Sequence, residues 1–315
     1  MASLLVTGGA GFIGANLLRQ LGGAGHRIRV LDNLARGRRE LLPESGVELV
    51  VADIRDPEAV TGALEEIDVV IHLAAFGSVA ESVSDPTENF DINARGTFEM
   101  LRHAAAAKVG KFVFASTGGA IMGDATPPID ERSLPWPISP YGASKLCGEA
   151  YCHAFAGSGG LPVVALRFAN VYGPYSAHKK GVVTKFIQNA LRDQPLEIFG
   201  DGNASRDFLH VEDLCRGIIA AIDADLSDNV LHLASEQETT IDELAGLIRD
   251  LVGKPDLPVI NHPRRAGEVE RNFARADRAR EVLGFVPAFD LRSGMADTLE
   301  WFRALEDTPA ASDRA

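Results

Sequence analysis

Short apolar segments alternate with longer amphipathic segments through the first half of this 315-residue chain, and this alternation restricts the possible folds more than any other feature. Short apolar runs are typical of strands buried on both faces of a sheet, and the stretches between them have helical patterns. Alternating strands and helices predict a parallel sheet with right-handed crossovers. We expect strands at Leu4–Thr7, Ile28–Leu31, Val47–Val51, Val69–Leu73, Phe112–Ala115 and Val163–Phe168, and helices at Phe12–Gly22, Pro57–Glu66, Asn89–Ala107 and Tyr141–Ala156.

The pattern changes after about Tyr172, where helical stretches mix with short strands and with proline and glycine turns. We therefore predict an α/β fold in two parts. Residues 1–172 form a doubly wound parallel sheet, and residues 173–315 form mainly a smaller, mixed α/β lobe. Residues 208–234 are expected to return to the main sheet. The helices expected in this half are Val182–Arg192, Val211–Ala224, Ile241–Val252 and Leu291–Leu305.

Composition narrows the classes of partner. The net charge of −13 argues against nucleic acids and against anionic membrane surfaces. No apolar run reaches about 18 residues, so no membrane-spanning helix is expected, and the first residues lack the basic region of a signal peptide. Three cysteines, Cys147, Cys152 and Cys215, show no metal-ligand spacing. They predict reduced thiols, a cytoplasmic location and no bound metal.

A glycine-rich segment follows the first expected strand and precedes the first expected helix. Its glycines form the pattern G-x-x-G-x-x-G. Glycines permit a tight turn and a close approach of a pyrophosphate to the backbone, and the helix N terminus supplies N–H donors. This order of elements predicts a Rossmann domain that binds a dinucleotide, rather than a glycine turn without a ligand. The expected cofactor contacts are Gly8, Gly11, Phe12, Ile13 and Gly14.

A carboxylate at the end of the second expected strand favours NAD over NADP. Asp32 lies 18 residues after Gly14, close to the roughly 20 expected for a carboxylate that binds the adenosine ribose. Asn33 follows it and is a further candidate contact. Three arginines, at 36, 38 and 39, could instead accept a 2′-phosphate, and the alternative is that they form a solvated loop.

The third expected strand is followed by Asp53 and Ile54, which we expect to contact the cofactor. A carboxylate at this place can reach the adenine amino group. The alternative interpretation is that Asp53 caps the helix that begins near Pro57.

The stretch SPYGASK (139–145) places Tyr141 and Lys145 one helical turn apart, so their side chains share a face. A neighbouring ammonium favours ionisation of a phenol, although such a pair could also be ordinary surface. Two other segments end at the same edge of the predicted sheet: His72-Leu73-Ala74-Ala75 and Ala115-Ser116-Thr117-Gly118-Gly119. Ligands of open parallel sheets bind beyond the carboxyl ends of the strands.

Together these motifs resemble the extended short-chain dehydrogenase/reductases, the NAD-dependent epimerase/dehydratases of nucleotide sugars. Among them the chain is most similar to UDP-glucose (UDP-galactose) 4-epimerases. The resemblance covers nearly the whole chain and rests on TGGAGFIG (7–14), LDN (31–33), DIRD (53–56), HLAA (72–75), ASTGGAIMGD (115–124), SPYGASK (139–145), LRFANVYGP (166–174) and FGDGNASRDFLHVEDL (199–214).

The resemblance implies roles for the catalytic residues. Tyr141 is the acid/base, and Lys145 binds the nicotinamide ribose and lowers the phenol pKa. The adjacent ammonium and the positive nicotinamide together favour the phenolate and bring its pKa towards 7. A hydroxyl that binds the reacting sugar hydroxyl falls on Thr117, with Ser116 as the second choice. Counting back from Gly123 places this hydroxyl on Gly118 instead. Met122 stands where the family usually has tyrosine, so this chain departs from the family pattern at the sugar pocket.

The resemblance also implies further contacts. Leu73, Ala74, Ala75 and Asn93 lie near the cofactor. The expected substrate contacts are Thr117, Tyr141, Asn170, Arg206 and Arg265 (for the diphosphate), Glu268 (for the uridine ribose) and Asn272 (beside the C2 substituent of the sugar). Five of these residues also have a structural interpretation. Asn93 could be a polar residue inside a helix, Asn170 a turn former, Arg206 and Arg265 surface residues, and Asn272 a loop residue.

The expected function is a UDP-sugar 4-epimerase with bound NAD. A 4,6-dehydratase lacks support because Gly118 and Gly119 stand where such enzymes carry Asp-Glu. A keto-sugar reductase, a uronic acid epimerase and a non-catalytic NAD-binding protein are the alternatives. The resemblance further implies a homodimer that pairs through 89–107 and 141–156, where small residues permit close helix contact: Ala104 to Ala107, Ala143, Gly148 and Ala150.

Overall fold

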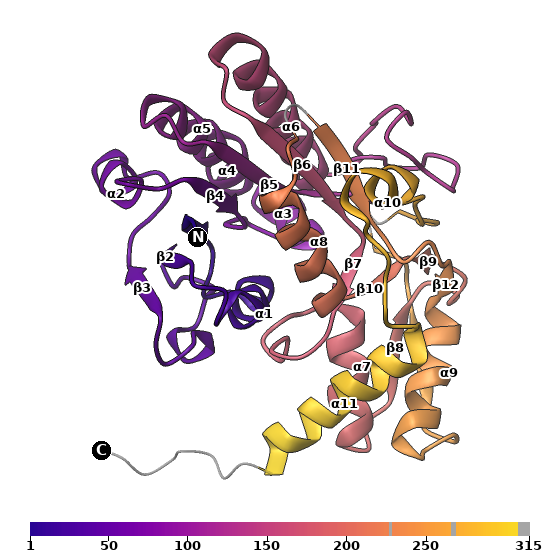
Figure 1. The fold of residues 1–315 in the computed structure, drawn as a ribbon. Helices are drawn as coiled ribbons and strands as arrows, with labels where there is room; N and C mark the ends of the chain where they lie inside the picture. Colours follow the sequence, from indigo (N-terminus) through magenta and orange to yellow (C-terminus); the bar gives the residue numbers. More distant parts are fainter. Residues whose placement is uncertain (227–228, 266–268, 308–315) are drawn as a thin grey trace.

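A seven-stranded parallel sheet, in the order β11-β6-β5-β4-β1-β2-β3, forms the centre of the molecule (Figure 1). The computed structural model describes residues 1–226, 229–265 and 269–307. The sheet strands are β1 (Ser3–Thr7), β2 (Arg27–Leu31), β3 (Val47–Val50), β4 (Val69–His72), β5 (Lys111–Thr117), β6 (Val163–Phe168) and β11 (Asn229–Leu233). This arrangement confirms the predicted doubly wound α/β fold with a C-terminal lobe.

Helices cover both faces of the sheet, and short elements fill the connections. The helices are α1 (Phe12–Leu21), α2 (Pro57–Ala63), α3 (Val79–Ser84), α4 (Pro86–Phe90), α5 (Gly96–Ala106), α6 (Pro140–Gly159), α7 (Val182–Leu191), α8 (Val211–Asp223), α9 (Ile241–Val252), α10 (Asp277–Leu283) and α11 (Leu291–Asp307), with short helices η1 (Arg39–Leu41) and η2 (Asp91–Arg95). The remaining strands are β7 (Asn170–Tyr172), β8 (Leu196–Phe199), β9 (Ser205–Arg206), β10 (Phe208–His210), β12 (Thr239–Thr240) and β13 (Val259–His262).

Strand β1 shows why the sheet must be covered on both sides. Its side chains alternate between faces, and its central residues Leu4, Leu5 and Val6 are apolar and fully buried. Leu4 packs in one cluster with Leu17 of α1, whereas Leu5 packs in a second cluster with Leu101 of α5. A strand that is apolar on both faces therefore needs a helix layer on each, which is the doubly wound arrangement.

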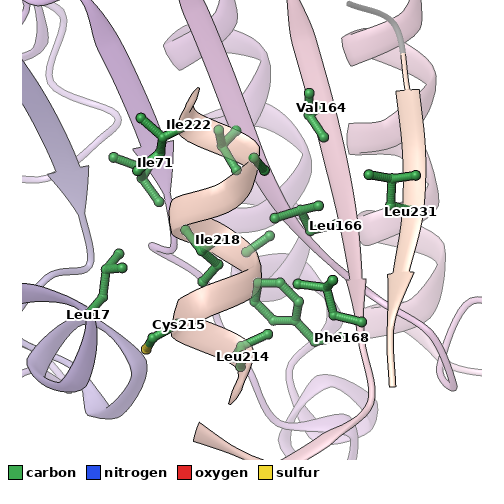
Figure 2. Close-up of a cluster of buried hydrophobic side chains, with 14 of the residues drawn as sticks. Leu17, Ile71, Val164, Leu166, Phe168, Leu214, Cys215, Ile218, Ile222 and Leu231 are labelled. Atoms are coloured by element: carbon green, nitrogen blue, oxygen red, sulfur yellow. The ribbon is translucent and has the colours of Figure 1, made fainter. Parts of the chain in front are cut away.

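Helix α8 closes the first of these clusters. Its Leu214 and Ile218 lie against the sheet near Leu166 and Phe168 of β6 (Figure 2). The chain then continues into β11, which pairs in parallel with β6 and forms the edge of the sheet. Both elements lie in the segment that was expected to return to the main sheet, although β10, at its start, pairs with β7 outside that sheet.

The C-terminal lobe has its own apolar cluster, formed by α7, α9, α11 and the β8–β13 pair. Phe186, Leu244 and Met295 are among its fully buried side chains. This lobe lies beyond the carboxyl ends of the sheet strands, beside β7 and β10 (Figure 1). The carboxyl ends of the sheet strands, where the candidate site lies, therefore face the C-terminal lobe.

Two expected helices differ from the observed ones. The helix expected over 57–66 ends at Ala63, and Glu66 has a φ of 57°, in the left-handed region that a helix cannot continue through. The single helix expected over 89–107 is divided into α4, the π-helical turn η2 and α5. The turn contains Asn93, whose side chain holds a neighbouring loop, and π turns of this kind often accompany functional sites.

Two of the small residues predicted at a dimer contact serve the core instead. Ala104 is fully buried. A Cβ on Gly148 would lie 2.5 Å from the Phe114 ring, so this glycine allows α6 to approach β5. Ala143 and Ala150, on the opposite face of α6, are exposed. The prediction was therefore wrong about which face Ala104 and Gly148 occupy.

Candidate active site

The glycine turn after β1 is tightly enclosed by backbone. Gly8 has a φ of 69°, and a Cβ on it would lie 2.7 Å from the Cα of Ala74. A Cβ on Gly14 would overlap the Gly9 backbone. Gly11 precedes α1 and supplies no side-chain cap, so the first N–H groups of α1 keep their capacity to bind an anion. This geometry fits the pyrophosphate of a dinucleotide, and the segment lies where the predicted cofactor residues Phe12 and Ile13 begin the helix.

A buried histidine contacts the residue that precedes the glycine turn. His72 Nδ1 lies 2.7 Å from the Thr7 hydroxyl, and its Nε2 lies 3.1 Å from the Thr97 hydroxyl. Complete burial lowers the pKa of His72 to about 3, so the ring is neutral. The Thr7 hydroxyl also accepts the Ala74 amide at 3.3 Å, and the adjoining Leu73 amide bonds to the Thr7 carbonyl. The expected contact residues 73–75 are thereby held against the glycine turn.

Asp32 ends β2 close to the same turn. Its carboxylate accepts the Ala10 amide at 3.0 Å and the Leu34 amide at 2.8 Å. Burial raises the pKa of Asp32, although both amides oppose that shift. Arg36, which could have received a 2′-phosphate, instead bonds to Glu81 at 2.7 Å and stacks on the Phe76 ring at 4.2 Å. A 2′-phosphate would have to compete with these contacts.

Asn33 and Asp53, predicted separately, bond to each other at 2.9 Å. Arg55 donates to both carboxylate oxygens of Asp53, also at 2.9 Å, and these bonds lower the pKa of Asp53 to about 2. The alternative that Asp53 caps a helix is wrong, because Asp56 accepts the first amides of α2. Ile54, the other residue predicted here, is buried in the core.

Tyr141 lies in the first turn of α6 and is partly buried. Ser139 caps this helix, and the Tyr141 amide donates to Ser82 of α3 at 3.1 Å. Burial raises the pKa of Tyr141 to about 12. In the protein itself, removal of the phenolate from water sets this upward direction, whereas the predicted lowering applies to a site that holds both the Lys145 ammonium and the positive nicotinamide.

Lys145, one turn later, points at the carboxyl end of β5. Its Nζ donates to the Ala115 carbonyl at 2.7 Å and lies 4.9 Å from the centre of the Phe114 ring. The residue is 2% exposed, and burial lowers its pKa to about 8. The Lys145 ammonium is therefore charged at neutral pH, although its pKa lies only about one unit above that pH.

The two candidate hydroxyls at the end of β5 point in different directions. Ser116 is buried and donates to Glu149 of α6 at 2.5 Å. Glu149 in turn forms a two-point ion pair with Arg167 of β6, at 2.9 and 2.8 Å. Thr117 is partly buried, and the Ala120 amide approaches its hydroxyl at 3.5 Å. Ser116 is thus engaged beneath α6, and Thr117 is the hydroxyl that remains at the strand end.

Asn93 fixes the loop that follows β4. Its Oδ1 accepts the Phe76 amide at 2.7 Å, and its Nδ2 lies 3.2 Å from both the Phe76 carbonyl and the Ser144 hydroxyl. Asn89 also donates to that carbonyl. Asn93 is buried and joins the loop after β4 to Ser144 of α6, three residues after Tyr141.

The predicted substrate residues lie on the lobe side. Asn170, on β7, is exposed, and Arg206, on β9, donates to the Ser205 and Glu270 carbonyls. Arg265 stacks 3.5 Å over the Phe199 ring. Glu268 lies outside the described residues. The segments that carry the two arginines adjoin, because Glu270 also pairs with the neighbouring Arg264 at 3.6 Å.

Asn272 reaches the end of β5. A Cβ on Gly119 would lie 3.0 Å from the Cγ of Asn272, which is 4% exposed. The backbone N–H of Asn272 donates to the Ser205 carbonyl, so β9 fixes the position of this residue. The tertiary structure thereby joins a loop residue of the lobe to the strand that carries Thr117.

Sequence reasoning missed several residues that build the site. Glu149 accepts a hydrogen bond from Ser116, and Ser82 accepts one from the Tyr141 amide. Glu81 forms an ion pair with Arg36. One signal was available: Tyr141, Lys145 and Glu149 follow one another at four-residue steps, which places all three on one helix face. The contacts of Ser82 and Glu81 join distant segments and left no local pattern.

Neither a membrane-spanning helix nor a metal-binding cluster is found among the described residues. In the part of the chain that the structure describes, no helix is both long and apolar enough to cross a membrane. Over the same residues, His, Cys, Asp and Glu side chains form no group of three or more that could hold a metal ion.

Comparisons with known proteins agree with this geometry. The chain is 38% identical over 310 residues to a UDP-glucose 4-epimerase of Mycolicibacterium smegmatis, covering 95% of this chain and 98% of that protein. It superposes with a TM-score of 0.93 on a Thermotoga maritima UDP-glucose 4-epimerase solved with UDP-glucose, at 36% identity, covering 97% of this chain and all of the other.

A Thermus thermophilus UDP-glucose 4-epimerase solved with NAD superposes with a TM-score of 0.91 at 35% identity, covering 96% and 99% of the two chains. The family model of the NAD-dependent epimerases and dehydratases matches residues 4–234. That range includes the glycine turn, β5 and the Tyr141–Lys145 pair. The chain therefore belongs to the NAD-dependent epimerase/dehydratase family.

Proposed function

We propose that this protein is a UDP-sugar 4-epimerase of the UDP-glucose/UDP-galactose type, which interconverts C4 epimers through a 4-keto intermediate. The observation that carries the proposal is the end of β5. Thr117 stands there near α6, which carries Tyr141, and the next two residues are Gly118 and Gly119. The strand end therefore offers a hydroxyl for the C4 oxygen and no carboxylate for chemistry at C5 or C6.

Bound NAD would supply the oxidation and reduction at C4. The glycine turn and the α1 N terminus would hold its pyrophosphate, and Asp32 its adenosine ribose. Tyr141 removes the proton of the C4 hydroxyl and gives it back. Thr117 orients that hydroxyl through a hydrogen bond.

The ionisation of Tyr141 is the step that the protein must assist. Burial raises its pKa to about 12, so on its own the phenol keeps its proton at neutral pH and cannot act as a base. The Lys145 ammonium and the positive charge of the oxidised cofactor both favour the phenolate, and they act strongly in a site that excludes water. The phenolate would therefore form at neutral pH only when the cofactor is in place.

The substrate diphosphate would be bound by Arg206 and Arg265, whose planar guanidinium groups suit paired phosphate oxygens. Asn170 is a further phosphate contact, and Glu268 would hold the uridine ribose. Asn272 would lie beside the C2 substituent of the sugar. It is smaller than an aromatic residue and can donate and accept hydrogen bonds, so we propose that N-acetylated sugars are accepted as well as plain hexoses.

Other members of the family are the main competing assignments. A 4,6-dehydratase needs an acid and a base after the strand-five threonine, and two glycines occupy those places. A keto-sugar reductase or a uronic acid epimerase could use the same Tyr141 and Lys145. A non-catalytic NAD-binding protein would have no use for a buried lysine aimed at the strand end.

The experiment is NMR analysis of the purified protein with a panel of UDP-sugars: UDP-glucose, UDP-galactose, the N-acetylated pair and UDP-glucuronate. Signals of the C4 epimer that appear from either partner and settle at one equilibrium ratio would support the proposal. Loss of C6 protons, loss of carbon dioxide or the absence of any new sugar signal would contradict it and indicate one of the alternatives.

We further propose that the protein acts as a homodimer in the cytoplasm. Exposed apolar side chains on the α4–α6 surface support the first part: Phe90, at 59% exposed, and Tyr151, at 40%. The second is supported by Cys147, Cys152 and Cys215, which form no disulfide, since an oxidising compartment favours disulfides.

A further inference from the structure

The loop between β7 and α7, residues 175–180, reaches from the C-terminal lobe to two helices beside the glycine turn. At its start, the Arg19 guanidinium of α1 stacks 4.0 Å from the centre of the Tyr175 ring. At its end, Lys180 forms an ion pair with Glu81 of α3 at 2.8 Å. Helix α1 follows the glycine turn, and α3 follows the β4 loop that encloses this turn. The loop is therefore held at both ends next to the proposed dinucleotide site.

Lys179 extends from this loop towards the start of α1. Its Nζ lies 4.5 Å from the centre of the Phe12 ring, and Phe12 is the first residue of that helix. The ammonium also donates to the Val171 carbonyl at 3.4 Å, a long distance for a hydrogen bond. An ammonium has three donors, so these contacts leave it able to bind an oxygen ligand.

The charge of Lys179 is not balanced by a carboxylate. In the part of the chain that the structure describes, Lys179 forms no ion pair, whereas its neighbour Lys180 does. The residue is partly buried, and burial lowers its pKa to about 8, so the ammonium is still largely charged at neutral pH. A partly buried charge without a partner is unfavourable, and an anion bound beside it would offset that cost.

The surroundings of Lys179 also suit an anion. The first N–H groups of α1 receive no side-chain cap. The Arg38 backbone N–H donates to the Ala10 carbonyl of the glycine turn at 2.9 Å, which places a second cationic residue at this turn. Arg38 and Lys179 both lie near His178, whose pKa is lowered by burial and by the two positive charges. Positive groups therefore gather around the glycine turn of a chain whose net charge is −13.

We propose that Lys179 binds the cofactor, and that its ammonium pairs with the pyrophosphate at the glycine turn and the N terminus of α1. The flexible stem of a lysine lets the ammonium turn from the Phe12 ring to a phosphate oxygen. The loop thus brings a positive charge from the C-terminal lobe to the phosphate site at the sheet. This inference rests on the proposed position of the pyrophosphate. The substrate carries the same diphosphate group, and Val171 follows its proposed contact Asn170, so the test measures both ligands.

The test measures release of NAD and binding of UDP on the same protein. Purified protein with its bound NAD is mixed at pH 7 with an excess of isotope-labelled NAD, and the exchange rate is followed by mass spectrometry. Calorimetric titration with UDP gives the affinity on the substrate side. In Lys179→Met we expect NAD exchange to be about 10- to 100-fold faster, the effect of losing one charge-assisted hydrogen bond, with an almost unchanged Kd for UDP.

Three further variants isolate the cause. Lys179→Arg keeps the positive charge and should retain most of the slow exchange. Lys179→Gln is a second neutral variant, which replaces Lys179→Met if the melting temperature shows that the methionine variant is unstable. Lys180→Met is the matched control, because it removes the same charge from the next residue. The Lys180 side chain is 79% exposed and pairs with Glu81, so its loss should change the exchange rate by less than about twofold.

Unchanged NAD exchange in the neutral variants at Lys179 would overturn the inference. An equal acceleration in Lys180→Met would also overturn it, because the cause would then be a general loss of positive charge. A loss of UDP affinity as large as the effect on NAD would assign Lys179 to the substrate diphosphate instead. The proposed function is judged separately: protein that retains NAD and epimerises UDP-sugars, but whose exchange does not respond to Lys179, keeps that function and loses only this inference. Protein that binds no NAD would remove the cofactor site on which both depend.

Discussion

Asn272 of the C-terminal lobe lies against Gly119 at the end of β5, where a Cβ would be 3.0 Å from the asparagine Cγ. A residue 153 positions away in the sequence thus borders the strand that carries Thr117. Gly119 has no side chain, and this allows the Asn272 side chain to lie directly against the backbone at the strand end.

We expect Asn272→Tyr to reduce turnover of N-acetylated UDP-sugars far more than turnover of the plain hexoses, because the larger ring would overlap the acetamido group. Kinetics with both sugar pairs measure the ratio. The exposed Asn203, which bonds to Asp201, supplies the control Asn203→Tyr, which should change neither. An equal loss on both kinds of sugar would remove Asn272 from the sugar pocket.

We expect Tyr141→Phe to lower kcat by about 10²–10⁴-fold, the usual effect of removing a positioned acid/base. Its amide bond to Ser82 does not use the phenol, so the fold and the bound NAD should be retained. Turnover by NMR and the absorbance of released cofactor measure the two effects. Near-normal turnover would show that another group carries the proton.

We expect Thr117→Ala and Ser116→Ala to differ in kind. Thr117→Ala should lower kcat by roughly 10²-fold with an almost unchanged melting temperature, because it removes a bond to the reacting oxygen. Ser116→Ala removes a buried hydrogen bond to Glu149 and should lower stability by about 1.5–3 kcal/mol. A larger loss of kcat in the serine variant, at equal stability, would reverse the assignment.

We expect Glu81→Gln to weaken the preference for NAD over NADP. Glu81 holds Arg36 at 2.7 Å and Lys180 at 2.8 Å, and a released Arg36 could reach a 2′-phosphate. Arg36 is half exposed, so the gain in relative NADP affinity should be modest, up to about fivefold for a contact of about 0.2–1 kcal/mol. Lys180→Met keeps the Arg36 pair and is the control; an equal change in both would exclude Arg36 as the cause.

We expect a dimer that separates when its apolar surface is charged. Tyr151 is exposed on α6 and contacts Phe98 of α5 at 5.0 Å between ring centres. Light scattering at micromolar concentration should give the dimer mass for the unmodified chain and the monomer mass for Tyr151→Glu. Val286→Glu, at another exposed apolar residue, should remain dimeric. A monomer mass for the unmodified chain would refute the pairing.

The strands, the glycine turn and the helix face of the catalytic pair could be predicted from the sequence, because they depend on residues that lie close together in the chain. Strands β1 and β6 are apolar on both faces, and the Gly8–Gly14 turn sits between a strand and a helix, so the parallel sheet and the phosphate site followed from periodicity and backbone freedom. The four-residue step from Tyr141 to Lys145 placed both on one helix face. Each of these patterns lies within a few residues.

Tertiary structure alone decided how these parts meet. It turned Ser116 towards Glu149 and left Thr117 at the strand end, tied Arg36 to Glu81, and brought Asn272 to Gly119. Such contacts join segments far apart in sequence, and their partners depend on how strands and lobes pack, so no local pattern could reveal them. Burial likewise moved the pKa of Tyr141 upward, since desolvation depends on everything that surrounds a group rather than on its neighbours in the chain.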